Sequence, residues 1–410
     1  MNLQEGSPEL QSESQTGLNQ GNVPAVSVPE ALVTESPSPV APLTDAPVPP
    51  PQEPAETRFL KWVLFGPHGV RVGWLTALFL VVAFLTTVIL GAIVLAILQN
   101  AFHVDTRAFN AGMSIVQETA QFASLLAAAW VSALIENRRI LDYNLHDSRG
   151  LRHFATGAGG GFAALSLLVA VLCVGGWLHI GWPTLSAGAV AEFAVLWGIG
   201  FLFTGLGEEG MTRCYMLFTL ERGINFWWAL GSVACLSLLA WTNPHGSEAG
   251  GVYLAAALGV APCFYLHWKR SPSAGFWEAA WLTSTFFGYI HTLNPGETWL
   301  GVFATAAIGF AFCVSVRVTG SAWWAIGFHA AWDWAQTFFY GTPDSGLQPR
   351  GHLFSSTASG SAFWSGGNTG PEGSVLILPT VLLIVMALVV VYGRRSRAES
   401  ASTADLPQLS

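Results

Sequence analysis

The chain has 410 residues, of which 52% are hydrophobic and only 10% are charged, and its mean hydropathy is +0.47. An ordinary soluble domain carries roughly a quarter charged residues, so this composition excludes a typical water-soluble globular protein. The formal net charge is −8 and only two lysines occur, which excludes a basic surface for nucleic acid. We therefore expect a protein whose main partner is the lipid bilayer.

Residues 1–57 form a tract rich in Pro, Ser, Glu and Val that contains acidic residues but no Lys or Arg. A cleavable signal peptide would show a basic stretch followed by an apolar one, and the tract has neither. Its composition instead indicates a disordered tail, which we place in the cytosol.

Apolar segments long enough to cross a bilayer follow the tail, since a membrane-spanning helix needs about 20 apolar residues. They cover approximately residues 74–98, 112–135, 155–179, 189–220, 226–241, 251–267, 276–291, 299–317, 321–340 and 374–393. The fourth is too long for a simple span, and we predict a helix with a break there. The predicted fold class is therefore all-α, a polytopic transmembrane bundle of about ten helices, with residues 58–186 forming its N-terminal part.

Basic residues predict which ends of these helices face the cytoplasm, where Lys and Arg accumulate. With ten spans, almost all basic residues fall on one side, and Arg107 and Arg350 are the main exceptions. The residues on that side are Arg58, Lys61, Arg71, Arg138, Arg139, Arg149, Arg152, Arg222, Lys269, Arg270, Arg317, Arg394, Arg395 and Arg397. We therefore predict cytoplasmic N- and C-termini, a cytosolic tail at 394–410, and an extracytoplasmic Gly/Ser-rich loop at 341–373 before the last span, 374–393.

Ionisable residues within predicted spans are costly, so they tend to be functional or paired. Glu208 and Glu209 are adjacent in the fourth segment, and Arg213 follows Glu209 by four residues. This spacing puts Glu209 and Arg213 on one helix face, where they can form an ion pair. A purely structural ion pair would explain only one of the two glutamates. The other would be suited to act as a general base.

Three further ionisable residues of the predicted spans belong with this set. His329 and Asp333 are four apart on one face of the segment 321–340, and His291 ends the segment 276–291. Each has an ordinary structural interpretation, as a hydrogen-bonded histidine within a bundle or an interfacial one at a helix end. Together with the two glutamates and the arginine, however, they match a site that activates water. A glutamate would take a proton from water, while histidines stabilise the oxyanion formed at a peptide carbonyl.

The order of these residues resembles the signature of the CPBP family, the CAAX proteases and bacteriocin-processing enzymes, which includes the type II CAAX prenyl endopeptidases. That signature is Glu-Glu-x-x-x-Arg, then Phe-x-x-x-His, then His-x-x-x-Asn/Asp. It is met here by Glu208 and Glu209 with Arg213, by Phe287 with His291, and by His329 with Asp333. The resemblance covers about residues 187–340, which we take as the catalytic transmembrane domain. It implies that Glu208 and His291 handle the water, whereas His329 and Asp333 support the oxyanion.

The distance along the chain from Glu209 to His291 is longer than the family usually shows. We interpret the excess as an inserted pair of helices within about 226–275, because an even number of extra helices keeps the topology. His245 is a rival for the middle histidine. Its neighbours Pro and Gly place it in a loop, so we favour His291.

The resemblance also implies that the protein is an enzyme, an intramembrane endopeptidase that acts on a membrane-associated CAAX-like or bacteriocin-like peptide. It further implies a multi-pass protein of the bacterial plasma membrane. Whether a metal takes part is left open, because Glu208, His291 and His329 could hold Zn²⁺ or another divalent metal, or could hold the water directly. Two other functions remain open at this point. Glu118 and Glu192 could join the site carboxylates in a transport pathway for protons or cations, or the chain could be a non-catalytic membrane scaffold.

Overall fold

The computed structural model describes residues 55–66, 69–100, 111–183, 185–242, 248–294 and 296–393. The predicted tail at 394–410, nearly all of the tail at 1–57, and His245 lie outside the described residues. Strands among the described residues form two short antiparallel pairs, β1 (Phe65–Gly66) with β2 (Gly69–Val70) and β3 (Leu178–Ile180) with β4 (Ser356–Ala358). The remaining regular structure is helical, which confirms the predicted all-α fold class.

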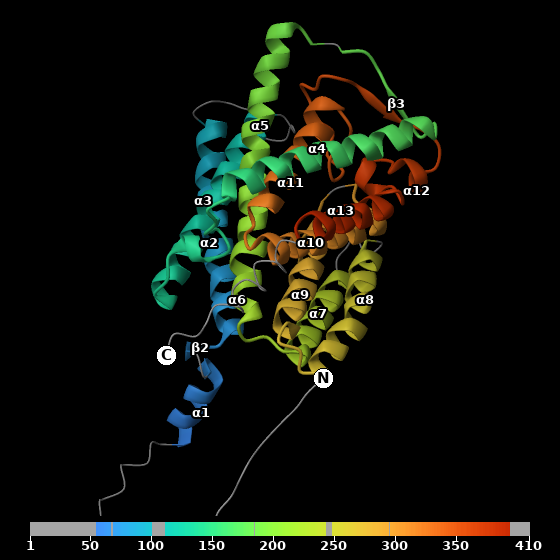
Figure 1. The fold of residues 1–410 in the computed structure, drawn as a ribbon. Helices are drawn as coiled ribbons and strands as arrows, with labels where there is room; N and C mark the ends of the chain where they lie inside the picture. The colour runs from blue at the N-terminus through green and yellow to red at the C-terminus, as the bar shows by residue number, and fades with distance from the viewer. Residues whose placement is uncertain are drawn as a thin grey trace, which may run out of the picture. The chain divides into compact units, whose positions relative to one another are not determined.

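Helices occupy all ten predicted apolar segments (Figure 1). These helices are α2 (Val72–Asn100), α3 (Ala111–Glu136), α4 (Gly150–Val174), α5 (Ala187–Glu209) continuing through a π-helical turn (Gly210–Met216) into α6 (Leu217–Glu221), α7 (Phe226–Trp241), α8 (Ala249–Trp268), α9 (Ala274–His291), α10 (Trp299–Thr319), α11 (Trp323–Trp334) with a π-helical turn (Ala335–Phe339), and α13 (Ile377–Val391). Shorter elements are α1 (Ala55–Leu64), α12 (Ala362–Ser365) and 3-10 turns at Ile140–Asp142 and Pro371–Gly373. By length and hydropathy, six of the described helical runs could cross a membrane, namely α2, α3, α4, α5–α6, α8 and α10.

The surface of the bundle is apolar, as expected for a protein surrounded by lipid. On α2, for example, the side chains of Phe84 and Ile89 are 68% and 57% exposed. Exposed apolar area on this scale is unfavourable in water but favourable in a bilayer. By contrast, α10 is largely buried and packs against α8, α9, α11 and α13. The chain is therefore an integral membrane protein.

Helix α11 crosses α4 at very close range (Figure 1). A Cβ atom added at Gly157 would lie 2.1 Å from the carbonyl oxygen of Trp324, and one at Gly161 would lie 2.3 Å from the carbonyl oxygen of Phe328. No side chain fits at either position without moving a backbone. Small residues four apart allow helix backbones in membranes to approach in this way. The two glycines therefore fix how α11 is placed in the bundle.

Replacing Gly161 with Leu should force α4 and α11 apart, because the new side chain would meet backbone atoms and not a flexible side chain. Overpacking of this kind costs about 1–3 kcal/mol or more. We expect a lower unfolding temperature for the purified Gly161→Leu protein in detergent, followed by tryptophan fluorescence. Gly159→Leu is the matched control on the same helix, since Gly159 is exposed and a Cβ atom added there would meet no atom within 4 Å. Equal unfolding temperatures for the two variants would contradict this role of Gly161.

Candidate active site

The glutamate pair lies where α5 passes into the π-helical turn. α5 ends at Glu209, and the chain continues as a helix through Gly210–Met216 into α6. The long fourth segment therefore contains a wider helical turn in place of the predicted break. Such turns are frequent at functional sites. The hydroxyl of Thr212 donates to the carbonyl oxygen of Glu208 at 2.6 Å, so a side chain helps to satisfy the backbone where the helix widens.

Glu209 is fully buried and connects two helices. Its Oε2 lies 3.3 Å from Nε of Arg213, and its Oε1 lies 2.9 Å from Nδ1 of His329. The first contact is the ion pair expected from the four-residue spacing. The second joins α5 to α11 and could not be read from local sequence. Glu209 therefore supports His329 from behind and does not itself line the cavity described below.

The guanidinium of Arg213 is held by aromatic rings as well as by the carboxylate. Its Cζ lies 4.3 Å from the ring centroid of Phe287 and 5.4 Å from that of Phe312. Gly309 of α10 leaves the space that the arginine needs, because a Cβ atom there would lie 2.3 Å from Nη2. Cation–π contacts of this kind are strongest where water is excluded. Arg213 is thus fixed in place by three helices.

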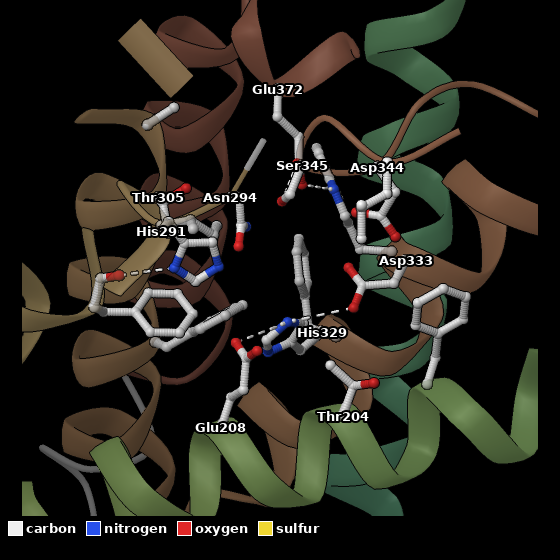
Figure 2. A pocket seen from close by; sticks show the side chains of 18 of the residues that line it. Thr204, Glu208, His291, Asn294, Thr305, His329, Asp333, Asp344, Ser345 and Glu372 are labelled. Carbon is white, nitrogen blue, oxygen red and sulfur yellow. Dashed lines mark hydrogen bonds and ion pairs between the residues drawn. The ribbon is translucent and has the colours of Figure 1, made fainter. Parts of the chain in front are cut away.

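His329 lies at the centre of the predicted constellation (Figure 2). Its Nε2 is 3.4 Å from Oδ2 of Asp333 and 3.8 Å from Oε2 of Glu208. With Glu209 at Nδ1, both ring nitrogens face carboxylate oxygens, and a doubly protonated ring could donate at each of them. The ring also packs nearly parallel to Phe312, with centroids 5.9 Å apart.

The side chains of Glu208 and His291 line the cavity (Figure 2). Among the described residues, Oε2 of Glu208 has no hydrogen-bond partner, and the side chain is 18% exposed. His291 ends α9, and its Nδ1 lies 2.8 Å from the carbonyl oxygen of Phe287. A carbonyl oxygen only accepts, so Nδ1 carries the proton, and Nε2 of a neutral ring has a free lone pair. Both residues can therefore contact a water molecule or a substrate.

These side chains share one cavity of about 300 Å³, which brings together Glu208, His291, His329 and Asp333 (Figure 2). Its other polar lining residues are Ser114, Glu118, Gln121, Thr204, Asn294, Thr305, Asp344, Ser345 and Glu372. Glu192, the other carboxylate considered for a transport pathway, is exposed and does not line it. Arg213 and Glu209 do not line the cavity. Of the six predicted residues, four therefore line the cavity and these two support them from the protein interior.

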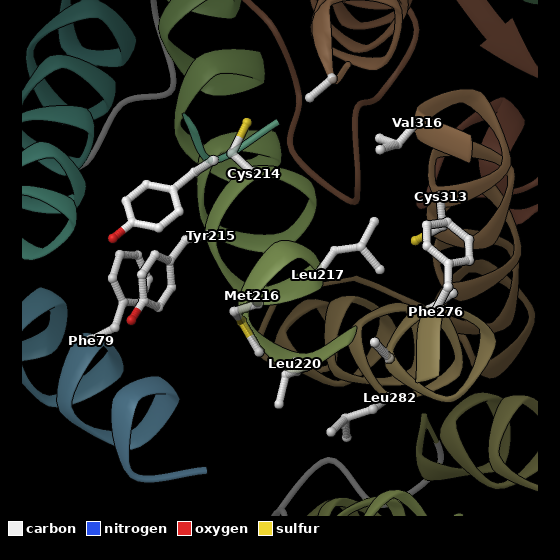
Figure 3. Close-up of a cluster of buried hydrophobic side chains, with 14 of the residues drawn as sticks. Phe79, Cys214, Tyr215, Met216, Leu217, Leu220, Phe276, Leu282, Cys313 and Val316 are labelled. Carbon is white, nitrogen blue, oxygen red and sulfur yellow. The ribbon is translucent and has the colours of Figure 1, made fainter. Parts of the chain in front are cut away.

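Apolar packing holds the π-helical turn on the side away from the cavity (Figure 3). The ring of Tyr215 stacks on Phe79 of α2, with centroids 3.9 Å apart, and meets Tyr143 edge-on at 5.0 Å. Cys214 and Leu217 are buried in the same cluster. Deep burial of these side chains holds the wider turn, which follows Glu208 directly, in place.

The segment 341–373, expected to be a loop, contributes three polar cavity residues, Asp344, Ser345 and Glu372, that sequence reasoning missed. Trp332 Nε1 donates to Oε1 of Glu372 at 2.8 Å, Ser345 donates to Oε2 of Glu372 at 3.2 Å, and Thr337 donates to Asp344 at 2.8 Å. Burial, followed by the charge of Glu372, raises the pKa of Asp344 to about 8. The Gly- and Ser-rich composition gave no signal that this segment would fold back onto α11.

Carboxylate spacing bears on the predicted metal site. Among the described residues, the one group of three potential ligands whose ligand atoms all lie within 4.8 Å of one another is Asp333, Asp344 and Glu372. The predicted ligands, Glu208, His291 and His329, do not form such a group. Their chemistry nevertheless suits a divalent cation, because each histidine has its Nδ1 held by an outer partner, as metal-binding histidines usually do.

Glu297 lies beside this region, between α9 and α10, and is only 6% exposed. Burial raises its pKa to about 8, and the charge of Glu372 adds to the shift. Between about pH 4.5 and about pH 8 the folded protein holds a proton on this group that the unfolded chain has released. The free energy of unfolding therefore falls as the pH rises through this range. We expect Glu297→Gln to reduce the loss of unfolding temperature between about pH 5 and about pH 8. Identical pH profiles for the variant and the native protein would contradict this.

Comparison with known proteins gives one family match. Residues 263–335 match the model of the type II CAAX prenyl endopeptidase Rce1-like family. The matched segment contains His291, His329 and Asp333, whereas the glutamate pair and Arg213 lie outside it. No curated protein and no solved structure matches the chain. The family match supports a protease of the CAAX endopeptidase type and agrees with the resemblance found in the sequence. The chain is thus an integral membrane protein in which residues 263–335 are similar to the Rce1-like type II CAAX prenyl endopeptidase family.

Proposed function

We propose that the protein is an intramembrane endopeptidase that hydrolyses a peptide bond in a membrane-associated substrate, with water activated by Glu208. The observation that carries the proposal is the meeting of Glu208, His291 and His329 in one cavity formed by membrane helices. A general base and a hydrogen-bond donor that face the same small polar space are what amide hydrolysis requires. The Rce1-like match supports the same reaction class.

In this mechanism Glu208 accepts the proton of the attacking water. Its side chain lines the cavity and is 18% exposed, so a water molecule in the cavity can bond to the carboxylate. The free Nε2 of His291 would accept the other hydrogen of that water and orient its oxygen toward the substrate carbonyl. The proton taken up by Glu208 then passes to the leaving amine, which completes hydrolysis.

His329 would stabilise the oxyanion of the tetrahedral intermediate through Nε2. The ring is oriented by Glu209, which is itself held by the buried Arg213. Asp333 lies 3.4 Å from the same Nε2 and keeps it directed into the cavity. A donor positioned before the reaction stabilises developing charge without the energetic cost of reorganisation.

A divalent cation such as Zn²⁺ is compatible with this donor set, and Glu208, His291 and His329 would hold it. When bound, the cation would lower the pKa of a water molecule and polarise the substrate carbonyl. Dialysis of the purified protein against a chelator, with metal analysis and restoration by defined metals, tests this part of the proposal. Unchanged cleavage by metal-free protein would exclude metal assistance.

Cleavage of membrane-anchored peptides by the purified protein in lipid vesicles, followed by mass spectrometry, tests the proposed function. Candidate peptides include prenylated CAAX-type and bacteriocin-type sequences. We expect His291→Ala to abolish cleavage. His267→Ala is the matched control, because His267 pairs with Glu278 at 3.5 Å and does not line the cavity. Full activity of His291→Ala would overturn the assignment.

A further inference from the structure

Basic side chains of the described residues collect at one end of the bundle, which we call the basic end. Its connections are tied together, since Ser321 donates to Asp147 at 2.6 Å, Ala322 N donates to the carbonyl oxygen of Asn144 at 2.8 Å, and Arg222 pairs with Glu136. The loops and helix ends there carry Arg138, Arg139, Arg149, Arg152, Arg222, Lys269, Arg270 and Arg317.

The other end of the bundle, which we call the acidic end, carries acidic residues and almost no basic ones. It comprises the connection 292–298, the segment 341–376 and the starts of α5 and α8. The connection and the segment are joined by a hydrogen bond from Thr369 to the carbonyl oxygen of Gly296 at 3.0 Å. Among the described residues, Arg350 is the only Lys or Arg at this end. Its acidic residues are Glu192, Glu248, Glu297, Asp344 and Glu372.

The cavity extends from the middle of the bundle toward the acidic end. α9 reaches it only with its last turns, through Phe287 and His291. α3 lines it with its first three turns, through Ser114, Glu118 and Gln121. The lining continues into the connections at the acidic end through Asn294 and Ser345. Figure 2 shows these loop residues, with Glu372, on the side of the cavity opposite Glu208. No lining residue belongs to the connections of the basic end.

Lys and Arg accumulate in cytoplasmic loops, so the basic end should face the cytoplasm. We propose that the cavity opens toward the extracytoplasmic side and that its substrate is an exported or membrane-anchored peptide whose cut segment emerges there. A cytosolic C-terminal peptide would meet the basic end and would not reach Glu208. This inference rests on the proposed function and assigns a substrate class to the same site.

Cysteine labelling of intact cells tests the orientation independently of activity. The background carries Cys173→Ala and Cys235→Ala, because Cys214, Cys263 and Cys313 are buried. Two variants are made in this background, one with Thr357→Cys at the acidic end and the other with Ser148→Cys at the basic end. Both positions are exposed. A membrane-impermeant maleimide should label Thr357→Cys in intact cells and Ser148→Cys only after permeabilisation. The reverse pattern would overturn the proposal.

A cleavage arm then tests the substrate class. Two reporters are built by fusing a peptide that the purified enzyme cuts to a single-span membrane anchor. The peptide lies outside the membrane in one reporter and in the cytoplasm in the other. We expect cleavage of the outer reporter alone, and cleavage of the cytoplasmic reporter alone would overturn the proposal. Absence of any cleavage by the purified protein, with the expected labelling, would overturn the proposed function and leave the orientation established.

Discussion

Glu208→Gln is expected to lower the rate of peptide hydrolysis by about 10²–10⁴-fold, the usual contribution of a general base. Glutamine has nearly the same shape as glutamate but cannot take the proton from water. The side chain is part of the cavity wall and pairs with no arginine, so the variant should fold normally. The measurement is kcat/KM on a cleaved peptide, together with the unfolding temperature.

Glu192→Gln is the control for this change, since Glu192 lies on the same helix but is exposed and outside the cavity. It should keep native activity. If Glu208→Gln retained native kcat/KM, another group would have to activate the water and the mechanism would be wrong. A loss of activity accompanied by unfolding would be separated from a catalytic effect by the unfolding temperature.

Arg213→Met should destabilise the protein by about 3–5 kcal/mol, because it leaves the Glu209 carboxylate buried without its cation. Both side chains are 0% exposed, so water cannot compensate. Replacing both partners, with Glu209→Gln added, should cost less than the sum of the single changes. The free energy of unfolding in mixed detergent, measured for the four proteins of this cycle, gives the coupling.

An exposed ion pair provides the comparison. Arg139 and Asp142 approach to 3.5 Å, and the arginine side chain is 78% exposed. Arg139→Met should therefore have little effect on the free energy of unfolding, because solvent screens an exposed pair. If Arg213→Met were equally mild, the buried pair would not be holding the π-helical turn and His329 together.

Most of the helices could be predicted from the sequence, because lipid requires long apolar segments with satisfied backbones. The local pairs were also accessible, since Glu209 with Arg213 and His329 with Asp333 are each four residues apart on one helix. The contact from Glu209 to His329 spans 120 residues and depends on how α5 and α11 pack. That packing is decided by close backbone contacts, which hydropathy does not describe.

Two parts of the site were beyond sequence reasoning. The long fourth segment suggested a break, but a π-helical turn leaves no distinct residue pattern. The segment 341–373 looked like an ordinary loop, although Asp344 and Glu372 line the cavity. Their placement depends on hydrogen bonds from Thr337 and Trp332, residues of the preceding helical run. The predicted tails and His245 lie outside the described residues and stay predictions.

The cavity has two kinds of wall, and they differ in how freely they can change. On one side α11 is locked to α4 by glycines that meet backbone oxygens, so the position of His329 tolerates little variation. On the other side the wall is an irregular segment held by side-chain hydrogen bonds, such as the one between Trp332 and Glu372, and by backbone hydrogen bonds, such as the one from Leu353 to Phe338. Loops of this kind accept insertions and exchanges far more readily than packed helices. New substrate preferences can therefore evolve, or be engineered by grafting residues 341–373, while the chemistry is kept.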